Sequence, residues 1–184
     1  MNNLSTSVFI IPVIALLLAI AGYLILLKQT IDKKTFNRLT VRIIGISLLL
    51  NFAWEMLQMP LFKGMDLNFQ DILFCAAASI ADTLMVVLLY FGFAIVYKEP
   101  FWAKQMSWQR ILLLIVVGFA GAVLAELRHT SAGNWSYSKS MPLIPVVDVG
   151  LSPVLQFMLL PVIIYYIAFF LLKNTNQKTH FFKT

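Results

Sequence analysis

Five long apolar runs, separated by polar or basic connections, dominate the pattern of the chain. The spans that the runs predict cover about residues 7–27, 41–62, 71–97, 111–127 and 150–172. Each run provides the roughly 20 apolar residues that an α-helix needs to cross the hydrocarbon core of a bilayer. The pattern therefore predicts an all-α integral membrane protein, with one transmembrane domain over residues 1–184 built as a five-helix bundle.

Composition agrees with this prediction and narrows the function classes. Hydrophobic residues make up 60% of the chain, charged residues only 12%, and the mean hydropathy is +0.85, which excludes an ordinary soluble domain. The net charge of +6 is better explained by membrane topology and by contacts with anionic lipid headgroups than by nucleic-acid binding. We therefore expect membrane lipid as a partner and no nucleic acid, with the oligomeric state left open.

The distribution of basic residues predicts the orientation of the bundle. Eleven Lys and Arg residues fall in the first connection, the third connection and the C-terminal tail, and three fall in the second and fourth connections. Because cytoplasmic loops carry the excess of Lys and Arg, the N-terminus is predicted outside and the C-terminus inside. In the third connection, Trp102 and Trp108 are predicted at the membrane interface.

An irregular outer loop is predicted between the fourth and fifth helices. Residues 129–149 are too polar and too rich in Gly and Pro for a helix. Pro142 and Pro145 also argue against a regular β-ladder, because proline has no N–H to donate. The loop joins the ends of two spans and should lie over the outer half of the bundle.

A polar stripe interrupts the second apolar run. Asn51, Glu55 and Gln58 follow one another at positions i, i+4 and i+7, which places them on one face of a helix. An ionisable side chain at the centre of a bilayer costs about 2.5–3.5 kcal/mol on insertion scales, so such residues usually face the protein interior and mark function. The stripe is the first candidate site.

The predicted topology gives this stripe its partners. Asp82 falls near the middle of the third span, Glu126 at the outer end of the fourth, and Gln156 in the outer part of the fifth. All of these groups are expected to converge in the outer half of the membrane.

Such a cluster suits proton transfer. An apolar pocket disfavours the charged form of a carboxyl group, so Glu55 or Asp82 is a candidate general acid, with Glu126 as a further catalytic candidate. Amides would orient the carboxyl groups, and aromatic faces would stabilise an electron-poor or carbocationic group. The candidate substrate-binding residues are Asn51, Trp54, Gln58, His129, Trp135, Tyr137 and Gln156.

Each candidate also has a purely structural interpretation. Glu55 and Asp82 would then form interhelical hydrogen bonds, and Glu126 and His129 would be solvated near the interface. Trp54 and Trp135 would be aromatic residues of the membrane belt, and a small-residue face around Gly118 would serve helix packing. No paired-histidine spacing, Gly-rich phosphate loop or cysteine pair occurs, so we expect no metal and no cofactor.

Two motifs carry a resemblance to a known family. Residues 51–60 read Asn-x-x-Trp-Glu-x-x-Gln-x-Pro, and residues 135–145 read Trp-x-Tyr-Ser-x-x-Met-Pro-x-x-Pro. Together with Glu126 and Gln156 they resemble a widespread bacterial family of small multi-pass membrane proteins without an assigned activity. The resemblance covers about residues 45–160. It implies one shared site and a location in the bacterial inner membrane.

A second resemblance rests on the Asn-x-x-Trp-Glu pattern alone. It is similar to a motif of the membrane-integral terpene cyclases of meroterpenoid pathways, which have seven spans. In that family a glutamate after a tryptophan and a distant aspartate handle the initiating proton. The resemblance implies this role for Glu55, and Asp82 is the aspartate considered as its partner.

Three function classes follow. The first is an intramembrane enzyme, of isomerase or cyclase type, that acts on an isoprenoid or other hydrophobic lipid substrate by proton transfer. The second is a proton- or cation-coupled transport protein, or a protein that binds a small amphiphile in the same polar pocket. The third is a structural or assembly membrane protein whose polar stripe pairs helices.

Overall fold

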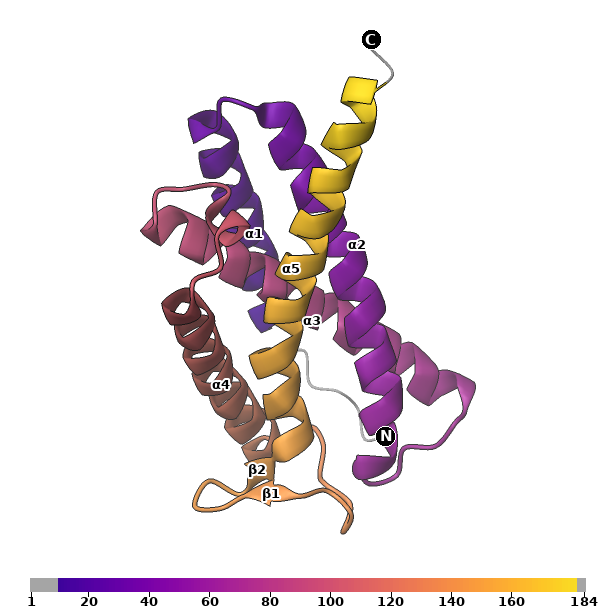
Figure 1. The fold of residues 1–184 in the computed structure, drawn as a ribbon. Coiled ribbons are helices and arrows are strands. Elements are labelled where there is room, and N and C mark those ends of the chain that lie inside the picture. The colour runs from indigo at the N-terminus through magenta and orange to yellow at the C-terminus, as the bar shows by residue number, and fades with distance from the viewer. Residues whose placement is uncertain (1–9, 182–184) are drawn as a thin grey trace.

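The fold is a bundle of long helices with one small β-hairpin. The computed structural model describes residues 10–181, and the side chains of residues 11–172. The long helices are α1 (Ile10–Gln29), α2 (Lys33–Gln58), α3 (Phe69–Val96), α4 (Trp108–Ser131) and α5 (Leu151–Phe181) (Figure 1). Two short 3-10 helices, η2 (Met59–Leu61) and η3 (Trp102–Lys104), and two strands, β1 (Leu143–Ile144) and β2 (Val149–Gly150), complete the described elements.

All five long helices have the length and apolar composition needed to cross a membrane. This confirms the predicted all-α bundle and supports an integral, multi-pass membrane protein. The orientation of the bundle in the membrane stays a prediction.

The helix bounds differ most from the predicted spans at the end of α5, which continues to Phe181 rather than to residue 172, and at the start of α2. Helix α2 begins at Lys33 because the side chain of Asp32 caps it, accepting a hydrogen bond of 3.0 Å from the backbone N–H of Thr35. Lys33, Lys34, Arg38 and Arg42 therefore lie on the first turns of a helix rather than in a loop. Helix α4 likewise extends the predicted span at both ends, from a Ser107 cap to Ser131. The predicted start of the first span, at residue 7, lies outside the described residues.

Each long helix packs on one or two of the others, in the order α1, α3, α2, α5, α4. Helix α3 packs on α1 and α2, while α5 packs on α2 and α4. The α2–α3 connection (residues 62–68) and the α4–α5 connection (residues 132–150) lie at the same end of the bundle (Figure 1). We call this end the hairpin end, because β1 and β2 form their antiparallel pair there.

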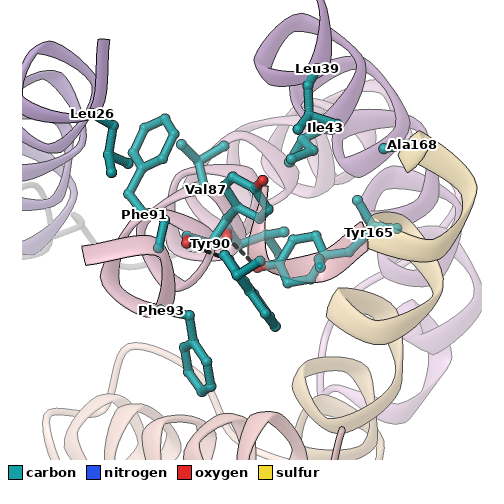
Figure 2. Packing of buried hydrophobic residues seen from close by; sticks show 14 of the residues in the cluster. Leu26, Leu39, Ile43, Val87, Tyr90, Phe91, Phe93, Tyr165 and Ala168 are labelled. Carbon is teal, nitrogen blue, oxygen red and sulfur yellow. Dashed lines mark hydrogen bonds between the residues drawn. The ribbon is translucent and has the colours of Figure 1, made fainter. Parts of the chain in front are cut away.

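An aromatic core fills the opposite end. Tyr90 and Tyr165 lie side by side at its centre, with ring centroids 5.2 Å apart (Figure 2). Trp102 is fully buried against them and donates a hydrogen bond of 3.1 Å from Nε1 to the carbonyl of Tyr90. The ring of Trp102 is therefore buried inside the bundle, whereas Trp108 is exposed, and the depth of both residues in the membrane stays a prediction. A sequence pattern cannot reveal that a tryptophan in a short connection folds back between two helices.

Helices α4 and α5 approach most closely at Gly118. A Cβ atom built on Gly118 would lie 2.2 Å from the backbone oxygen of Phe157, whereas one built on Gly121 would meet nothing within 4 Å. On the small-residue face of α4, the packing therefore requires glycine at position 118, whereas position 121 has room for a larger side chain.

We expect Gly118→Ala to destabilise the protein by about 1–3 kcal/mol, because a methyl group there forces two backbones apart. Gly121→Ala is the matched control on the same helix, and should be neutral or stabilising by up to about 1 kcal/mol, since alanine favours helix over glycine. Unfolding in mixed detergent micelles measures both changes. Equal effects of the two variants would contradict the close approach of α4 and α5.

Candidate functional site

Gln156 of α5 is the centre of a polar network that joins three helices. Its Nε2 donates to Asn51 Oδ1 of α2 at 3.0 Å and to Asp82 Oδ2 of α3 at 2.9 Å. Its Oε1 accepts a hydrogen bond of 3.2 Å from Gln58 Nε2. Only 2% of Gln156 is exposed, so these bonds form away from solvent.

Two serines fix the other amides of the network. Asn51 donates from Nδ2 to both the carbonyl and the hydroxyl oxygen of Ser47, at 2.9 Å each. Ser152, in the first turn of α5, donates at 2.9 Å to Gln58 Oε1. Because every N–H of the three amide groups has an acceptor, the orientation of each amide is determined by its partners.

Two carboxyl groups meet inside this amide frame. Glu55 accepts a hydrogen bond of 2.7 Å from Gln58 Nε2, and its side chain lies within hydrogen-bonding contact of Asp82. A carboxylate has no hydrogen to donate, so a hydrogen bond between two carboxyl groups requires a proton on one of them. The sequence stretches around the pair, residues 43–62, 64–97 and 140–172, contain no Lys or Arg.

Glu126 holds a third carboxyl group in a different setting. It is 7% exposed, and its Oε2 accepts hydrogen bonds from Trp135 Nε1, at 3.2 Å, and from the hydroxyl of Tyr137. Burial, together with the hydrogen bond to Glu126, raises the pKa of Tyr137 above its ordinary value, so this hydroxyl keeps its proton at physiological pH. Glu126 also lies close enough to Glu55 and Asp82 to interact with both electrostatically.

The loop that supplies Trp135 and Tyr137 is attached to the end of α2. The backbone N–H of Lys63 donates to Ser136 O, and that of Ser138 donates to Leu61 O, both at 2.9 Å. The ring of Phe62 contacts the rings of Trp135 and Tyr137, with centroids 6.4 and 5.7 Å away. These contacts place the loop aromatics beside the carboxyl groups.

The remaining sequence candidates are separated: His129 lies beside Trp135, and Trp54 packs against the aromatic core. His129 stacks on Trp135 with ring centroids 4.4 Å apart, and its Nδ1 lies 2.8 Å from Asn134 Nδ2. Trp54 is half-buried, and its Nε1 is a buried donor without a hydrogen-bond partner among the described residues. Trp54 therefore keeps a free donor next to Glu55 in the chain.

The structure brings together two groups of candidates. Asn51, Glu55, Gln58, Asp82 and Gln156 form one network, and Glu126, His129, Trp135 and Tyr137 form a second group beside it. Among the described residues, no three His, Cys, Asp or Glu side chains have the spacing of a metal site.

Sequence reasoning missed three contributors. Ser47 is four residues before Asn51 on the same helical face, which is a usable signal for a hydroxyl that holds an amide. Ser152 and Phe62 carry no comparable signal in the sequence. Their roles depend on contacts across about 75 to 95 residues of chain, which no local pattern encodes.

Fold and site together define a multi-pass helical membrane protein with a buried carboxyl and amide network. No protein-family model matches the chain, and neither a comparison with curated proteins nor one with solved structures finds a match.

Proposed function

We propose that the protein is an intramembrane enzyme that transfers a proton to and from an isoprenoid or other lipid, as an isomerase or cyclase does. The observation that carries the proposal is that one frame of linked amides holds both carboxyl groups: Gln58 donates to Glu55 and to Gln156, and Gln156 donates to Asp82. A hydrogen bond between the two carboxyl groups would place a proton on one of them, and a carboxylic acid beside an apolar substrate is what general acid catalysis requires.

The two carboxyl environments suggest a division of roles. Glu126 accepts hydrogen bonds from Trp135 and Tyr137, which orient its carboxyl group, and in its ionised form Glu126 would stabilise a positive centre on the substrate. Trp54, Trp135 and Tyr137 add aromatic faces that attract a cation. Glu55 and Asp82 would then act as the acid and base pair.

The proposed step conserves the formula of the substrate. The proton shared by Glu55 and Asp82 is added to one carbon of an alkene, whose π electrons form the new C–H bond and leave a carbocation. Loss of a proton from a neighbouring carbon to the resulting carboxylate reforms a double bond, directly or after ring closure. The enzyme regains its proton, and no oxidant, reductant or metal is consumed.

The two resemblances of the sequence support a bacterial inner-membrane location and a Trp-Glu acid as parts of this proposal. The substrate it implies is a hydrophobic small molecule that reaches the site through the bilayer.

Solvent deuterium tests the proposal. Purified protein in liposomes containing a polyprenyl lipid is incubated in deuterium oxide, and the lipids are analysed by mass spectrometry. We expect a catalyst-dependent gain of carbon-bound deuterium, because the acid exchanges its proton with solvent between turnovers. The same protein in protonated water provides the reference spectrum. Lipids that co-purify with the protein are tested in the same way, and the absence of deuterium from both sets would contradict the proposal.

A coupled transporter or amphiphile binder is the second candidate. It is favoured by the grouping of three carboxyl groups in helices whose facing stretches contain no Lys or Arg. This alternative predicts pH-dependent uptake of a cation or amphiphile into proteoliposomes. It also predicts that the lipid gains no deuterium, so one sample distinguishes the two candidates.

A further inference from the structure

The β-hairpin exposes a strip of apolar side chains at the end of the bundle. It lies crosswise at the ends of α4 and α5 (Figure 1). Its inner face packs on these helices through Ile144, Val147 and Val149. Its other face is open, with Leu143 46% and Val146 99% exposed.

The backbone at the tip of the hairpin does not require an apolar residue. Val146 has a φ of +78°, in the left-handed region that β-branched residues rarely adopt. Glycine or asparagine would take this conformation with less strain. An exposed valine in this conformation gains nothing from the fold itself, so its hydrophobic surface points to a ligand outside the chain.

The hairpin also hides most of its own polar groups. Pro142 and Pro145 have no N–H, and the N–H of Asp148 donates to Ile144 O at 3.0 Å. The N–H of Leu151 donates to the carbonyl of Pro142 at 2.8 Å. A segment with few unpaired backbone N–H groups can enter the boundary between headgroups and acyl chains at a small cost in free energy.

We propose that Leu143, Pro145 and Val146 form a lipid anchor that inserts into the leaflet next to the hairpin end. The occupant is the bilayer itself, because the strip lies at the ends of α4 and α5, two helices apolar enough to span a membrane, and α4 also exposes Leu124 (68%) and Leu127 (37%) in its last turns. Asp148, which is exposed beside the tip, limits the insertion to the headgroup boundary. The anchor would also hold the loop that carries Trp135 and Tyr137 at a fixed depth.

Depth-dependent fluorescence quenching tests the anchor. Cysteine is introduced as Val146→Cys, labelled with an environment-sensitive dye and reconstituted into phosphatidylcholine liposomes with spin-labelled lipids. Ser140→Cys, at an exposed polar position just before the hairpin, is the matched control. The native Cys75 is 1% exposed, so the unsubstituted protein serves as the labelling blank.

At position 146 we expect blue-shifted emission and strong quenching by spin labels near the headgroup, with weaker quenching by labels deep in the acyl chain. The dye at position 140 should show neither effect. Equal quenching at the two positions would overturn the anchor. Protection from aqueous iodide without quenching by lipid, lost on dilution of the protein in lipid, would assign the surface to a second copy of the chain and would also overturn it. The test requires no enzymatic activity, so its outcome is independent of the proposed function.

Discussion

Substitution of Glu55 by glutamine is expected to reduce deuterium incorporation into the lipid at least about 100-fold while leaving the fold intact. Glutamine has the shape of a protonated glutamic acid. Its oxygen can still accept from Gln58, and its amide can donate to Asp82 in place of the shared proton. The network keeps its hydrogen bonds but loses the exchangeable acid. Since general acid catalysis contributes about 10²- to 10⁴-fold, turnover should fall by that factor.

Two companion variants make this result specific. Glu99→Gln removes a carboxylate from an ion pair with Arg110, 3.3 Å long, at the opposite end of the bundle, and should leave turnover unchanged. Asp82→Asn should reduce turnover as Glu55→Gln does. The double variant should be little worse than either single one, because residues that act as a unit are not additive. Full turnover by Glu55→Gln with an unchanged melting temperature would rule out the acid role.

The lengths of the apolar runs predicted the bundle because a bilayer imposes a simple rule on sequence. A spanning segment must satisfy its own backbone and must be apolar, so hydropathy alone located the five helices. It did not locate their ends, since α2 continues through the basic residues 33–42 that a hydropathy pattern assigns to a loop. Capping by Asp32, and not polarity, determines where that helix begins.

The candidate site was predictable to a similar degree. A polar residue in an apolar run is costly enough to be informative, which is why Asn51, Glu55 and Gln58 stand out. Their partners on other helices were inferred from the predicted depth of each residue along its membrane-spanning helix. Which amide donates to which carboxyl was not predictable, because a shift of one helix by a fraction of a turn would re-pair every hydrogen bond.

The same limit applies to the loop. The Gly and Pro content of residues 129–149 predicted irregular structure, but the loop contains a short ladder between Leu143 and Gly150 that the prolines were expected to prevent. Pro142 and Pro145 flank the two paired residues rather than interrupt them. Positions of proline relative to a ladder, and not their number, decide whether a hairpin forms.

Replacement of Gln156 by leucine should produce the largest loss of stability among substitutions in the site. The change removes the hydrogen bonds to Asn51, Asp82 and Gln58 together, so that the Asn51 Oδ1, the Asp82 Oδ2 and one N–H of Gln58 lose their Gln156 partner in the bundle interior. Each unpaired group costs about 1–3 kcal/mol in a soluble core, and somewhat less per hydrogen bond between membrane helices. We expect a total loss of about 2–4 kcal/mol in mixed-micelle unfolding.

Gln70→Leu is the matched control, since it makes the same chemical change at an exposed position next to the start of α3 and should alter stability by less than about 0.5 kcal/mol. The double variant Asn51→Leu and Gln156→Leu should recover part of the loss, because replacing both partners removes the unpaired acceptor on Asn51.

These stability values also distinguish a catalytic role of the network from a role in helix pairing alone. If Gln156→Leu destabilises the protein while Glu55→Gln leaves both stability and lipid chemistry unchanged, the network only pairs helices. If Glu55→Gln instead loses deuterium incorporation at full stability, the amides hold the carboxyl pair in place for proton transfer.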